Sequence, residues 1–354
     1  MEKDVYARLR EFLDKMPGGY PATSSRVEIK LLKKLFTPEQ AEITMQLKPF
    51  PEPLEVIAAR LGMNEAEAKE KLEKMSNEGL IMGPKLGGKL HYLALSFVVG
   101  IYEFHMNSID RELAELFEEY LPNLGLVWAT TKTKQLRIVP VGSAVESVPS
   151  VAAYDRVREM VKKQTMASVA QCICRKERAL LDHPCERKTS EICLQFGMAA
   201  QYSVEKGLSR EISVSEALRL LDVAEDEALV LSPANTQDLL NICCCCGCCC
   251  GLLRGLKMMP NPGDFVQSAY QASIDPDLCS GCESCLDRCQ VDAIKEDGDI
   301  MKVEKGRCIG CGLCVSACPE EAINFMERAK VEPPPANIVE TMMKIAKERG
   351  LTFK

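Results

Sequence analysis

Cysteine is the residue that sets this sequence apart, with 19 copies in 354 residues. Thiolates bind soft metal ions and iron–sulfur clusters, and pairs of thiols form disulfides. Eight of the cysteines form an internal repeat with a constant offset of 29 positions. The first half supplies Cys279, Cys282, Cys285 and Cys289, and the second supplies Cys308, Cys311, Cys314 and Cys318. We therefore expect two halves related by pseudo-symmetry.

Each half of the repeat has the spacing C-x2-C-x2-C-x3-C. With this spacing, one short loop wraps three thiolates around a cubane and the fourth thiolate crosses to the other cluster. A zinc module or a disulfide knot is the alternative, but zinc sites pair two cysteine knuckles rather than interleave eight thiols. Gly281, Gly310 and Gly312 also favour clusters, because glycine lets the backbone come close to sulfur. The 12 acids and 5 bases of residues 264–326 favour the oxidised state and a low potential.

The repeat resembles the bacterial two-[4Fe–4S] ferredoxin domain over about Ser273 to Met326. The resemblance implies two ligand sets, which are Cys279, Cys282, Cys285 and Cys318 for one cluster and Cys308, Cys311, Cys314 and Cys289 for the other. The second half keeps the Cys-Pro pair of this family as Cys318-Pro319, whereas Gln290 stands in the proline position of the first half. This departure leaves the ligands intact, and we expect it to alter the local turn and the environment of the cluster.

The other cysteines lie in the centre of the chain, and they are Cys172, Cys174, Cys185, Cys193, Cys243, Cys244, Cys245, Cys246, Cys248, Cys249 and Cys250. Cys172 and Cys174 are two residues apart, so on a strand they would point to the same face. The first four thiols are enough for one metal site. The later seven exceed the four that a cubane takes, so some are spare or more than one site exists. Cys246 has C-x2-C spacing to cysteines on both sides, and Gly247 allows a sharp turn. Small buried hydrophobes or a redox-active dithiol are the alternatives.

Several segments around the central cysteines together resemble a widespread family of iron–sulfur proteins from anaerobes. The segments are Gln171-Cys-Ile-Cys-Arg-Lys, Asp182-His-Pro-Cys185, Glu191-Ile-Cys193-Leu-Gln-Phe-Gly197 and the later cysteine run. The likeness covers about residues 165–326, and members are described only as 4Fe–4S binding proteins, so it implies no reaction. In that family the position of Cys244 is often polar, which makes Cys244 the least favoured ligand. The other central cysteines are expected to hold one or two further iron–sulfur clusters, with zinc as the alternative.

Three polar residues near the central cysteines give weaker evidence for a role in a metal site. We expect a turn or capping role for His183, because four thiolates are already available near it. Arg175 and Lys176 follow the first cysteine pair, where they could hydrogen-bond to cluster sulfurs, accept carboxylates of a partner or serve as surface charges.

Residues 1–150 contain no cysteine and read mainly as helices. The range 54–61 has apolar residues at helical spacing, Gly62 ends it, and Asn64 could cap a second helix through about Gly79. The glycine-rich segment 80–95 then resembles a hairpin wing. These features predict a winged helix-turn-helix, followed by a long amphipathic helix from about Val99 to Tyr120. The second helix has net charge −2 over Asn64–Gly79, so we expect docking or dimerisation rather than DNA binding.

The expected fold class is α+β with several domains. We expect a winged-helix-like docking or dimerisation domain over 1–150, a cysteine-rich α/β segment over 151–262, a two-cluster ferredoxin domain over 263–330 and a C-terminal tail or helix over 331–354. In the central segment we expect helices near 154–163, 192–206 and 213–223 and strands at 168–172 and 228–231. No apolar run approaches the roughly 18–20 residues of a membrane span. The N-terminus lacks the features of a secretory signal, so we expect a cytoplasmic protein.

These patterns favour an iron–sulfur electron-transfer protein that passes single electrons between a partner oxidoreductase and the central cysteine-rich site. The partner would perform the chemistry, so the chain is expected to be an electron-transfer component or subunit, and the sequence names no catalytic residue. One alternative is a reductase whose substrate reacts at the central cysteines. The other is a redox-sensing DNA-binding regulator. The net charge of −7 equals that of residues 264–326, so the rest of the chain is neutral overall, which argues against a general polyanion binder.

Overall fold

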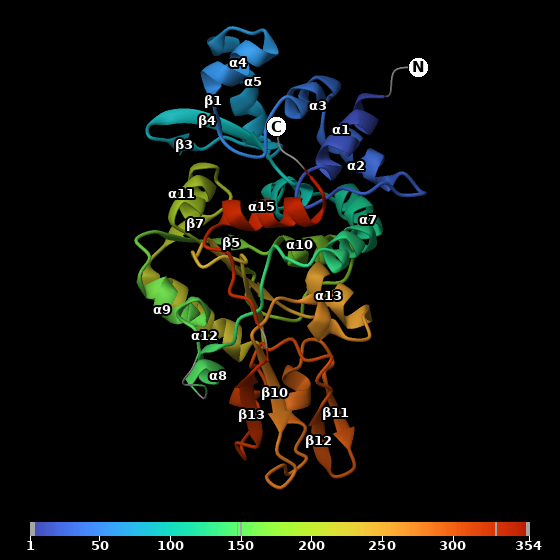
Figure 1. Cartoon of the computed structure of the whole chain (residues 1–354), viewed down its shortest axis with the longest axis vertical. Helices are drawn as coiled ribbons and strands as arrows, with labels where there is room; N and C mark the ends of the chain where they lie inside the picture. Colours follow the sequence, from blue (N-terminus) through green and yellow to red (C-terminus); the bar gives the residue numbers. More distant parts are fainter. Residues whose placement is uncertain (1–3, 147, 149–150, 330, 352–354) are drawn as a thin grey trace. The chain divides into compact units, whose positions relative to one another are not determined.

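A computed structural model describes residues 4–146, 148, 151–329 and 331–351. The chain divides into two compact units, of which the first comprises residues 1–132, 179–183 and 345–354 and the second comprises 133–178 and 184–344. Figure 1 labels the elements along the chain. The second unit contains both the central cysteines and the ferredoxin-like repeat. The expected boundaries at residues 150 and 330 fall on positions outside the described residues.

The first unit is mainly helical. Its helices are α1 (Val5–Asp14), α2 (Val27–Leu35), α3 (Pro38–Met45), α4 (Leu54–Leu61), α5 (Glu65–Asn77), α6 (Tyr102–Phe104) and α7 (Arg111–Thr130). Its antiparallel strands are β1 (Glu52–Pro53), β2 (Ile81–Met82), β3 (Lys85–Leu86) and β4 (Lys89–Ala94). Strand β4 pairs with each of the other three.

The two helices and the hairpin predicted between residues 54 and 95 are present. Gly62 ends α4 in a left-handed conformation, with φ of 65°, which glycine adopts without steric cost. The side chain of Asn64 accepts a hydrogen bond from the backbone N–H of Glu67 and caps α5. Local capping residues therefore set these helix boundaries.

The long helix expected from Val99 to Tyr120 is wrong in its placement. Residues Phe97–Ile101 are an irregular segment, and α6 is a single turn. Helix α7 begins only at Arg111, where the Asp110 side chain accepts a hydrogen bond of 2.8 Å from the N–H of Leu113. The apolar periodicity located a helix here but missed the cap that starts it.

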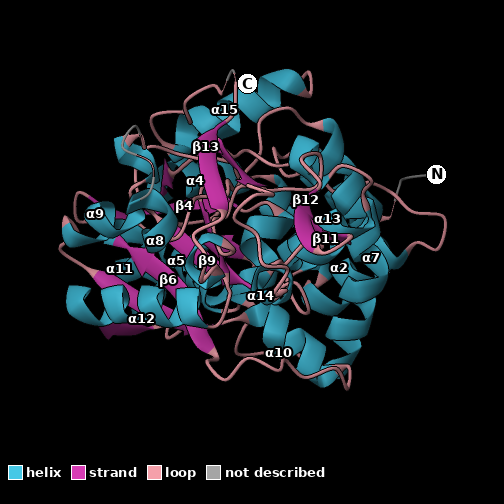
Figure 2. Cartoon of the chain, turned by 90° about the horizontal axis from the view of Figure 1, so that it is seen from below, coloured by secondary structure: helices cyan, strands magenta, loops and turns pink. Residues whose placement is uncertain are grey.

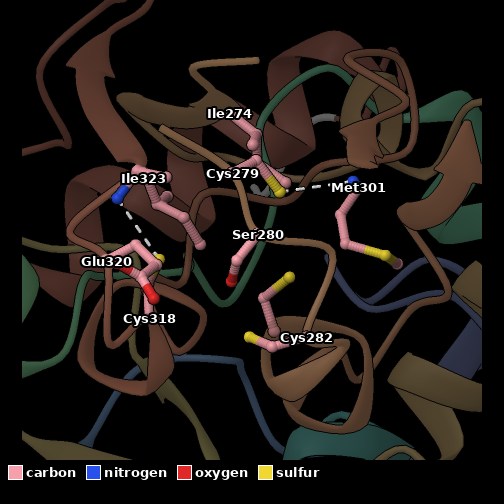
Figure 3. A pocket seen from close by; sticks show the side chains of 10 residues that line it. Ile274, Cys279, Ser280, Cys282, Met301, Cys318, Glu320 and Ile323 are labelled. Carbon is pink, nitrogen blue, oxygen red and sulfur yellow. Dashed lines mark hydrogen bonds between the residues drawn. The ribbon is translucent and has the colours of Figure 1, made fainter. Parts of the chain in front are cut away.

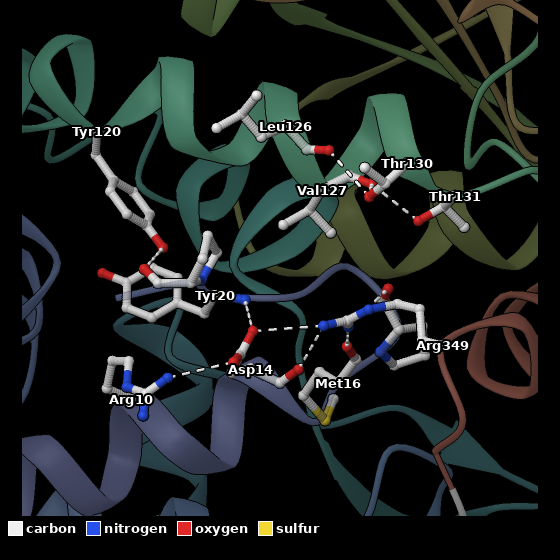
Figure 4. Close-up of polar contacts among 12 residues, drawn as sticks. Arg10, Asp14, Met16, Tyr20, Tyr120, Leu126, Val127, Thr130, Thr131 and Arg349 are labelled. Carbon is white, nitrogen blue, oxygen red and sulfur yellow. Dashed lines mark hydrogen bonds and ion pairs between the residues drawn. The ribbon is translucent and has the colours of Figure 1, made fainter. Parts of the chain in front are cut away.

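A partly buried polar contact joins two distant segments of the first unit. The guanidinium of Arg349 donates to the backbone oxygens of Met16 and Asp14, at 2.6 and 2.9 Å, and lies 3.4 Å from the Asp14 carboxylate (Figure 4). The same carboxylate accepts from the N–H of Tyr20 at 3.0 Å. One arginine thus bonds to backbone oxygens at and just after the end of α1, where a helix leaves carbonyls without intrahelical partners.

The second unit is built on a five-stranded antiparallel sheet with strand order β7-β5-β6-β9-β8. The strands are β5 (Ala167–Gln171), β6 (Glu191–Phe196), β7 (Arg210–Ile212), β8 (Val230–Pro233) and β9 (Asn241–Cys245). The helices and helical turns are α8 (Gly142–Glu146), η2 (Ala153–Asp155), α9 (Val157–Lys162), α10 (Ile173–Leu180), α11 (Gly197–Glu205), α12 (Val214–Asp226), α13 (Gly251–Met258) and η3 (Pro262–Phe265). Figure 2 shows α12 alongside β6, which it contacts.

Three features of the central segment differ from the sequence-based expectations. The helix expected near 192–206 is strand β6 followed by α11, because Gly197 at φ of 56° turns the chain between them. The cysteine run begins with strand β9, for which no element was expected. Cys172 and Cys174 do not share a strand, since Cys172 follows β5 and Cys174 lies in α10.

The two faces of the sheet differ in chemistry. One face is apolar and packs into the core through residues such as Leu194 and Ile242, together with Leu221 of α12. The opposite face carries Cys193 and Cys243, which are paired across β6 and β9. Because side chains alternate along a strand, Cys245 lies on the same face as Cys243. The sheet therefore separates a packing face from a thiol-bearing face.

The repeat folds into two antiparallel strand pairs, β10 with β13 and β11 with β12. The strands and helical turns are β10 (Tyr270–Ile274), α14 (Ser284–Arg288), β11 (Ile294–Asp297), β12 (Ile300–Val303), η4 (Val315–Ala317) and β13 (Ile323–Glu327), and α15 (Ile338–Glu348) follows. The offset of 29 residues maps β11 onto β13 and β10 onto β12. The predicted pseudo-symmetry is therefore present in the strands.

A buried ion pair links the repeat to the segment that precedes the central sheet within the second unit. Arg137 is paired with Asp155, and the hydroxyl of Tyr270 in β10 donates to the same carboxylate at 3.3 Å. Burial raises the pKa of Asp155 and lowers that of Arg137, and each partner opposes the shift of the other. Removing one partner would leave a buried charge uncompensated, which is strongly destabilising. Among the described residues, no helix is both long enough and apolar enough to cross a membrane.

Candidate metal centres

Four thiols of the repeat line one pocket. Cys279, Cys282, Cys285 and Cys318 border it together with Ile274, Ser280, Met301 and Glu320. Figure 3 shows the side chains of Cys279, Cys282 and Cys318 around this space. Three of these cysteines come from one loop, while Cys318 comes from the other half of the repeat. The pocket thus gathers the donor set that the ferredoxin resemblance implies for the first cluster.

The second set is more deeply placed. Cys308 and Cys314 are buried, and burial raises the pKa of Cys311 to about 12. The sulfurs of Cys289 and Cys308 add to that rise, which puts Cys289 beside the thiols of the second half. In the first set, by contrast, Cys282 is exposed. The two sets share a residue pattern but differ in their access to solvent.

Backbone N–H groups donate to sulfur at equivalent positions of the two halves. Ala293 N–H donates to Cys289 at 3.1 Å, and Ala322 N–H donates to Cys318 at 3.2 Å. The other equivalent pair is Met301 N–H to Cys279 at 3.4 Å and Ala272 N–H to Cys308 at 3.5 Å. Such bonds stabilise thiolates and tune the potential of a bound cluster. The pseudo-symmetry therefore extends to the sulfur environment.

Two glycines at equivalent positions allow this close approach. Gly281 and Gly310 have φ of 68° and 72°, and a Cβ at either would collide with a backbone carbonyl, that of Asp299 or of Tyr270. These carbonyls are themselves related by the offset of 29. Glycine is required at both positions, because any side chain would push the loop away from the strand.

A compact tetrad of thiols lies in the central segment. The sulfurs of Cys185, Cys246, Cys248 and Cys249 all lie within 4.8 Å of one another. Cys185 is 3.7 Å from both Cys246 and Cys248, and Cys248 is 3.7 Å from Cys249. A hydrogen bond from the Cys249 thiol lowers the pKa of Cys246 to about 4. The tetrad therefore offers a ready thiolate and three neighbouring thiols, a donor set suited to a soft metal.

Six other thiols form a ring. Cys174 is hydrogen-bonded to Cys172 and Cys250, and Cys245 to Cys250 and Cys243. Cys243 also contacts Cys193, its partner across β6 and β9, and Cys172 acts electrostatically on Cys193. The thiol ring is defined as these six residues, which are Cys172, Cys174, Cys193, Cys243, Cys245 and Cys250.

Cys244 stands apart from both groups. It is 2% exposed, and strand alternation turns it to the apolar face with Ile242. Burial raises its pKa, so it remains a neutral thiol in a hydrophobic core. The structure thus brings together the ten expected central ligands in two groups and leaves Cys244 in the packing layer. His183 is exposed and belongs to neither group.

Arg175 lies beside both groups. It is 5% exposed, and its guanidinium donates to the backbone oxygen of Thr189. Burial lowers its pKa, but the sulfurs of Cys246, Cys172 and Cys185 outweigh that effect and raise it overall. A buried cation against thiols favours a negatively charged occupant.

Sequence reasoning missed a contact between the repeat and the cysteine run. Gln290, the residue in the proline position, is 6% exposed, and its side-chain oxygen accepts a 2.8 Å hydrogen bond from the N–H of Gly247. A Cβ on Gly247 would press against the backbone oxygen of Gln290 at 2.5 Å. Gln290 follows Cys289, and Gly247 lies between Cys246 and Cys248. The missing proline was the only signal in the sequence for this junction.

Comparison with known proteins bears on one part of the chain. No curated protein and no solved structure matches the chain. A family model described as a 4Fe-4S dicluster domain matches residues 272–325. That range contains both ligand sets of the repeat. The C-terminal part of the second unit is therefore a 4Fe–4S dicluster domain, and the chain is an iron–sulfur binding protein.

Proposed function

We propose that this protein transfers single electrons between a partner oxidoreductase and its own central cysteine-rich region. Cys279, Cys282, Cys285 and Cys318 would hold one [4Fe–4S] cluster, and Cys308, Cys311, Cys314 and Cys289 the other. These clusters would supply one-electron exchange at low potential. The donor sets, the N–H bonds to sulfur and the two close-approach glycines support this assignment.

The single observation that carries the proposal is the hydrogen bond from Gly247 to Gln290. It joins the residue after Cys289 to the loop that supplies thiols to both central groups. A proline at position 290 has no side-chain amide and could not make this bond. The sequence therefore departs from the ferredoxin pattern at the residue that contacts the central region.

The exposed side of the dicluster domain suits a basic partner. Cys282 is exposed, and the exposed side chains near the first set include Asp277, Glu283, Asp287 and Glu320. Leu278 is also 54% exposed beside these acids. A partner with a positive surface would be steered to the first cluster, and the attraction would weaken with added salt.

We propose that the first unit is a winged-helix-like docking module rather than a DNA-binding one. On α5, Lys71 is paired with Glu39 at 2.5 Å and with Glu67 at 3.3 Å, and Lys69 lies 3.9 Å from Glu73. These lysines already have acidic neighbours, so they are poorly placed to neutralise phosphates. A homodimer through this unit stays a prediction.

The electron path is tested with full-length protein purified and reduced without oxygen, then mixed with oxidised cytochrome c, a basic one-electron acceptor. The wild type should deliver electrons in two phases, the faster from the dicluster domain and the slower from the central region. Gln290→Ala should slow the later phase and leave the first phase and the iron content unchanged. Its matched control is Gln201→Ala, an exposed glutamine on α11.

If the wild type delivers only the two electrons of the dicluster domain, electron transfer from the central region would be contradicted. A reduced protein that ignores the cytochrome but is oxidised by a small substrate would instead favour the reductase alternative. If Gln290→Ala and the wild type show equal kinetics, the hydrogen bond between Gln290 and Gly247 has no role in electron transfer.

A further inference from the structure

We propose that the central cysteines form two metal sites of different kinds. The compact tetrad binds one tetrahedral metal ion, zinc or a single iron, without sulfide. The thiol ring binds an iron–sulfur cluster. This inference rests on the proposed function only in treating the central thiols as metal ligands.

The distances within the tetrad match a single ion. Four thiolates at 2.3 Å from one zinc ion, in tetrahedral geometry, are about 3.8 Å apart. Three sulfur pairs of the tetrad are 3.7 Å apart, and all the pairs lie within 4.8 Å. The thiolates around a cubane must be farther apart, because each binds a different iron of the cube.

The dicluster domain provides an internal standard for the wider spacing. Among the described residues, the tetrad forms the cysteine group whose sulfurs are all within 4.8 Å, and no three thiols of either ferredoxin set meet that limit. The two kinds of site thus differ in sulfur spacing within one chain. The tetrad resembles neither cubane set in this respect.

The thiols of the ring are too far apart for one tetrahedral ion. Among the described residues, no three of its six sulfurs lie within 4.8 Å of one another, a limit that the tetrad meets. The ring thiols come from different elements: Cys193 and Cys243 are paired across two strands, Cys245 is on the same face of β9, and Cys250 precedes α13. Wider spacing suits a cluster of several irons, because each thiolate binds a different iron.

Packing alone does not explain the ring. Cys172, Cys174, Cys193 and Cys243 are partly exposed residues, and every ring thiol has at least one other ring thiol as a neighbour. Cys244, on the other face of the same strand, instead packs among apolar neighbours with 2% exposure. Neighbouring thiols can bind a common metal centre.

Arg175 supplies an independent observation. Its guanidinium is buried, and Cys172 of the ring and Cys185 and Cys246 of the tetrad lie near it. Each thiol that binds metal gives up its proton, so the loaded sites carry negative charge. A cation between them would offset that charge.

Metal and acid-labile sulfide per chain distinguish the two sites on protein purified without oxygen. The dicluster domain accounts for about eight irons and eight sulfides. The wild type should have at least about four more of each, counted as one added cubane, and one further metal ion without sulfide. Cys185→Ser should lose that single ion and keep all of its sulfide. Elemental analysis decides between zinc and iron at the tetrad.

The matched variant for the ring is the triple replacement of Cys193, Cys243 and Cys245 by Ser, which leaves three ring thiols. It should lose iron and sulfide in equal amounts and keep the single ion. Cys244→Ala, on the packing face, should lose neither. If the triple variant fails to fold, the sulfide content of the wild type still decides whether the ring holds a cluster.

A wild type with only eight sulfides overturns the cluster at the ring. A loss of about four sulfides on Cys185→Ser overturns the single ion, because that is the loss expected from a cubane. The absence of any metal at the tetrad would also overturn the single-ion assignment. In each of these cases the eight irons of the dicluster domain and their electron transfer would persist, so failure of this inference is distinguishable from failure of the dicluster assignment in the proposed function.

Discussion

The dicluster domain and the central sheet both gather thiols, but they do so by different routes. In the dicluster domain one pocket is lined by three cysteines of one loop and by Cys318 of the other half of the repeat. In the central sheet, consecutive cysteines go to different surroundings: Cys243 and Cys245 to the ring, Cys244 to the core, Cys246 to the tetrad. Loop spacing identifies ligands only where the loop closes locally.

The two halves of the repeat also differ in what surrounds them. Gly312 and Glu283 are equivalent positions, with left-handed φ of 76° and 61°. A Cβ on Gly312 would collide with Ala144 of α8, whereas Glu283 is exposed to solvent. At this position the second half packs against α8, whereas the first half is open to solvent. An internal repeat can therefore give two clusters with different roles.

The largest expected effect is the loss of a whole cluster. Cys314→Ala should remove about four irons and four sulfides, because a cubane needs all four of its thiolates. Cys244→Ala should leave both counts at the wild-type value, since Cys244 packs in the core. Iron and sulfide analysis checks both variants. Full iron in the Cys314 variant would refute its place in the second ligand set.

A smaller effect is expected from the close-approach glycines. Gly310→Ala places a Cβ against the Tyr270 carbonyl and should cost about 2–4 kcal/mol of unfolding free energy. Gly298→Ala is the matched control, since its φ is 69° but nothing lies within 4 Å, and it should cost about 1 kcal/mol. Denaturant unfolding without oxygen measures both. Equal costs would show that conformation, not crowding, makes glycine necessary at Gly310.

The smallest effect concerns the first unit, which contains no cysteine. Burial lowers the pKa of His105, whose Nδ1 lies 2.6 Å from the backbone oxygen of Ile101. The neutral ring is thus favoured in the folded state. Its contribution to stability is complete above the unfolded-state pKa of about 6.5 and is lost as the pH falls below it.

The corresponding test compares the wild type with His105→Gln at pH 7 and at pH 5. The wild type should lose more stability on acidification than the variant does, and any change at the thiols is common to both proteins. Thermal unfolding followed by circular dichroism provides the measurement. The same acid sensitivity in both proteins would exclude a contribution from His105.

Much of the dicluster domain followed from the sequence. The spacing C-x2-C-x2-C-x3-C and the offset of 29 residues predicted the pseudo-symmetric halves, because a short loop leaves few ways to arrange its thiols. The helices α4 and α5 were also predicted, since Gly62 and Asn64 act on adjacent residues. The start of α7 was missed, because the Asp110 cap interrupts a continuous apolar pattern.

The sequence by itself determined which residues could bind metal, and only the tertiary structure decided how the central ones are divided. The strand pairing of β6 with β9 places Cys193 beside Cys243, and the alternation along β9 removes Cys244 from that face. The bond of Gln290 to Gly247 likewise joins residues 43 positions apart. These relations depend on contacts between distant segments, and neither composition nor local spacing carries information about such contacts.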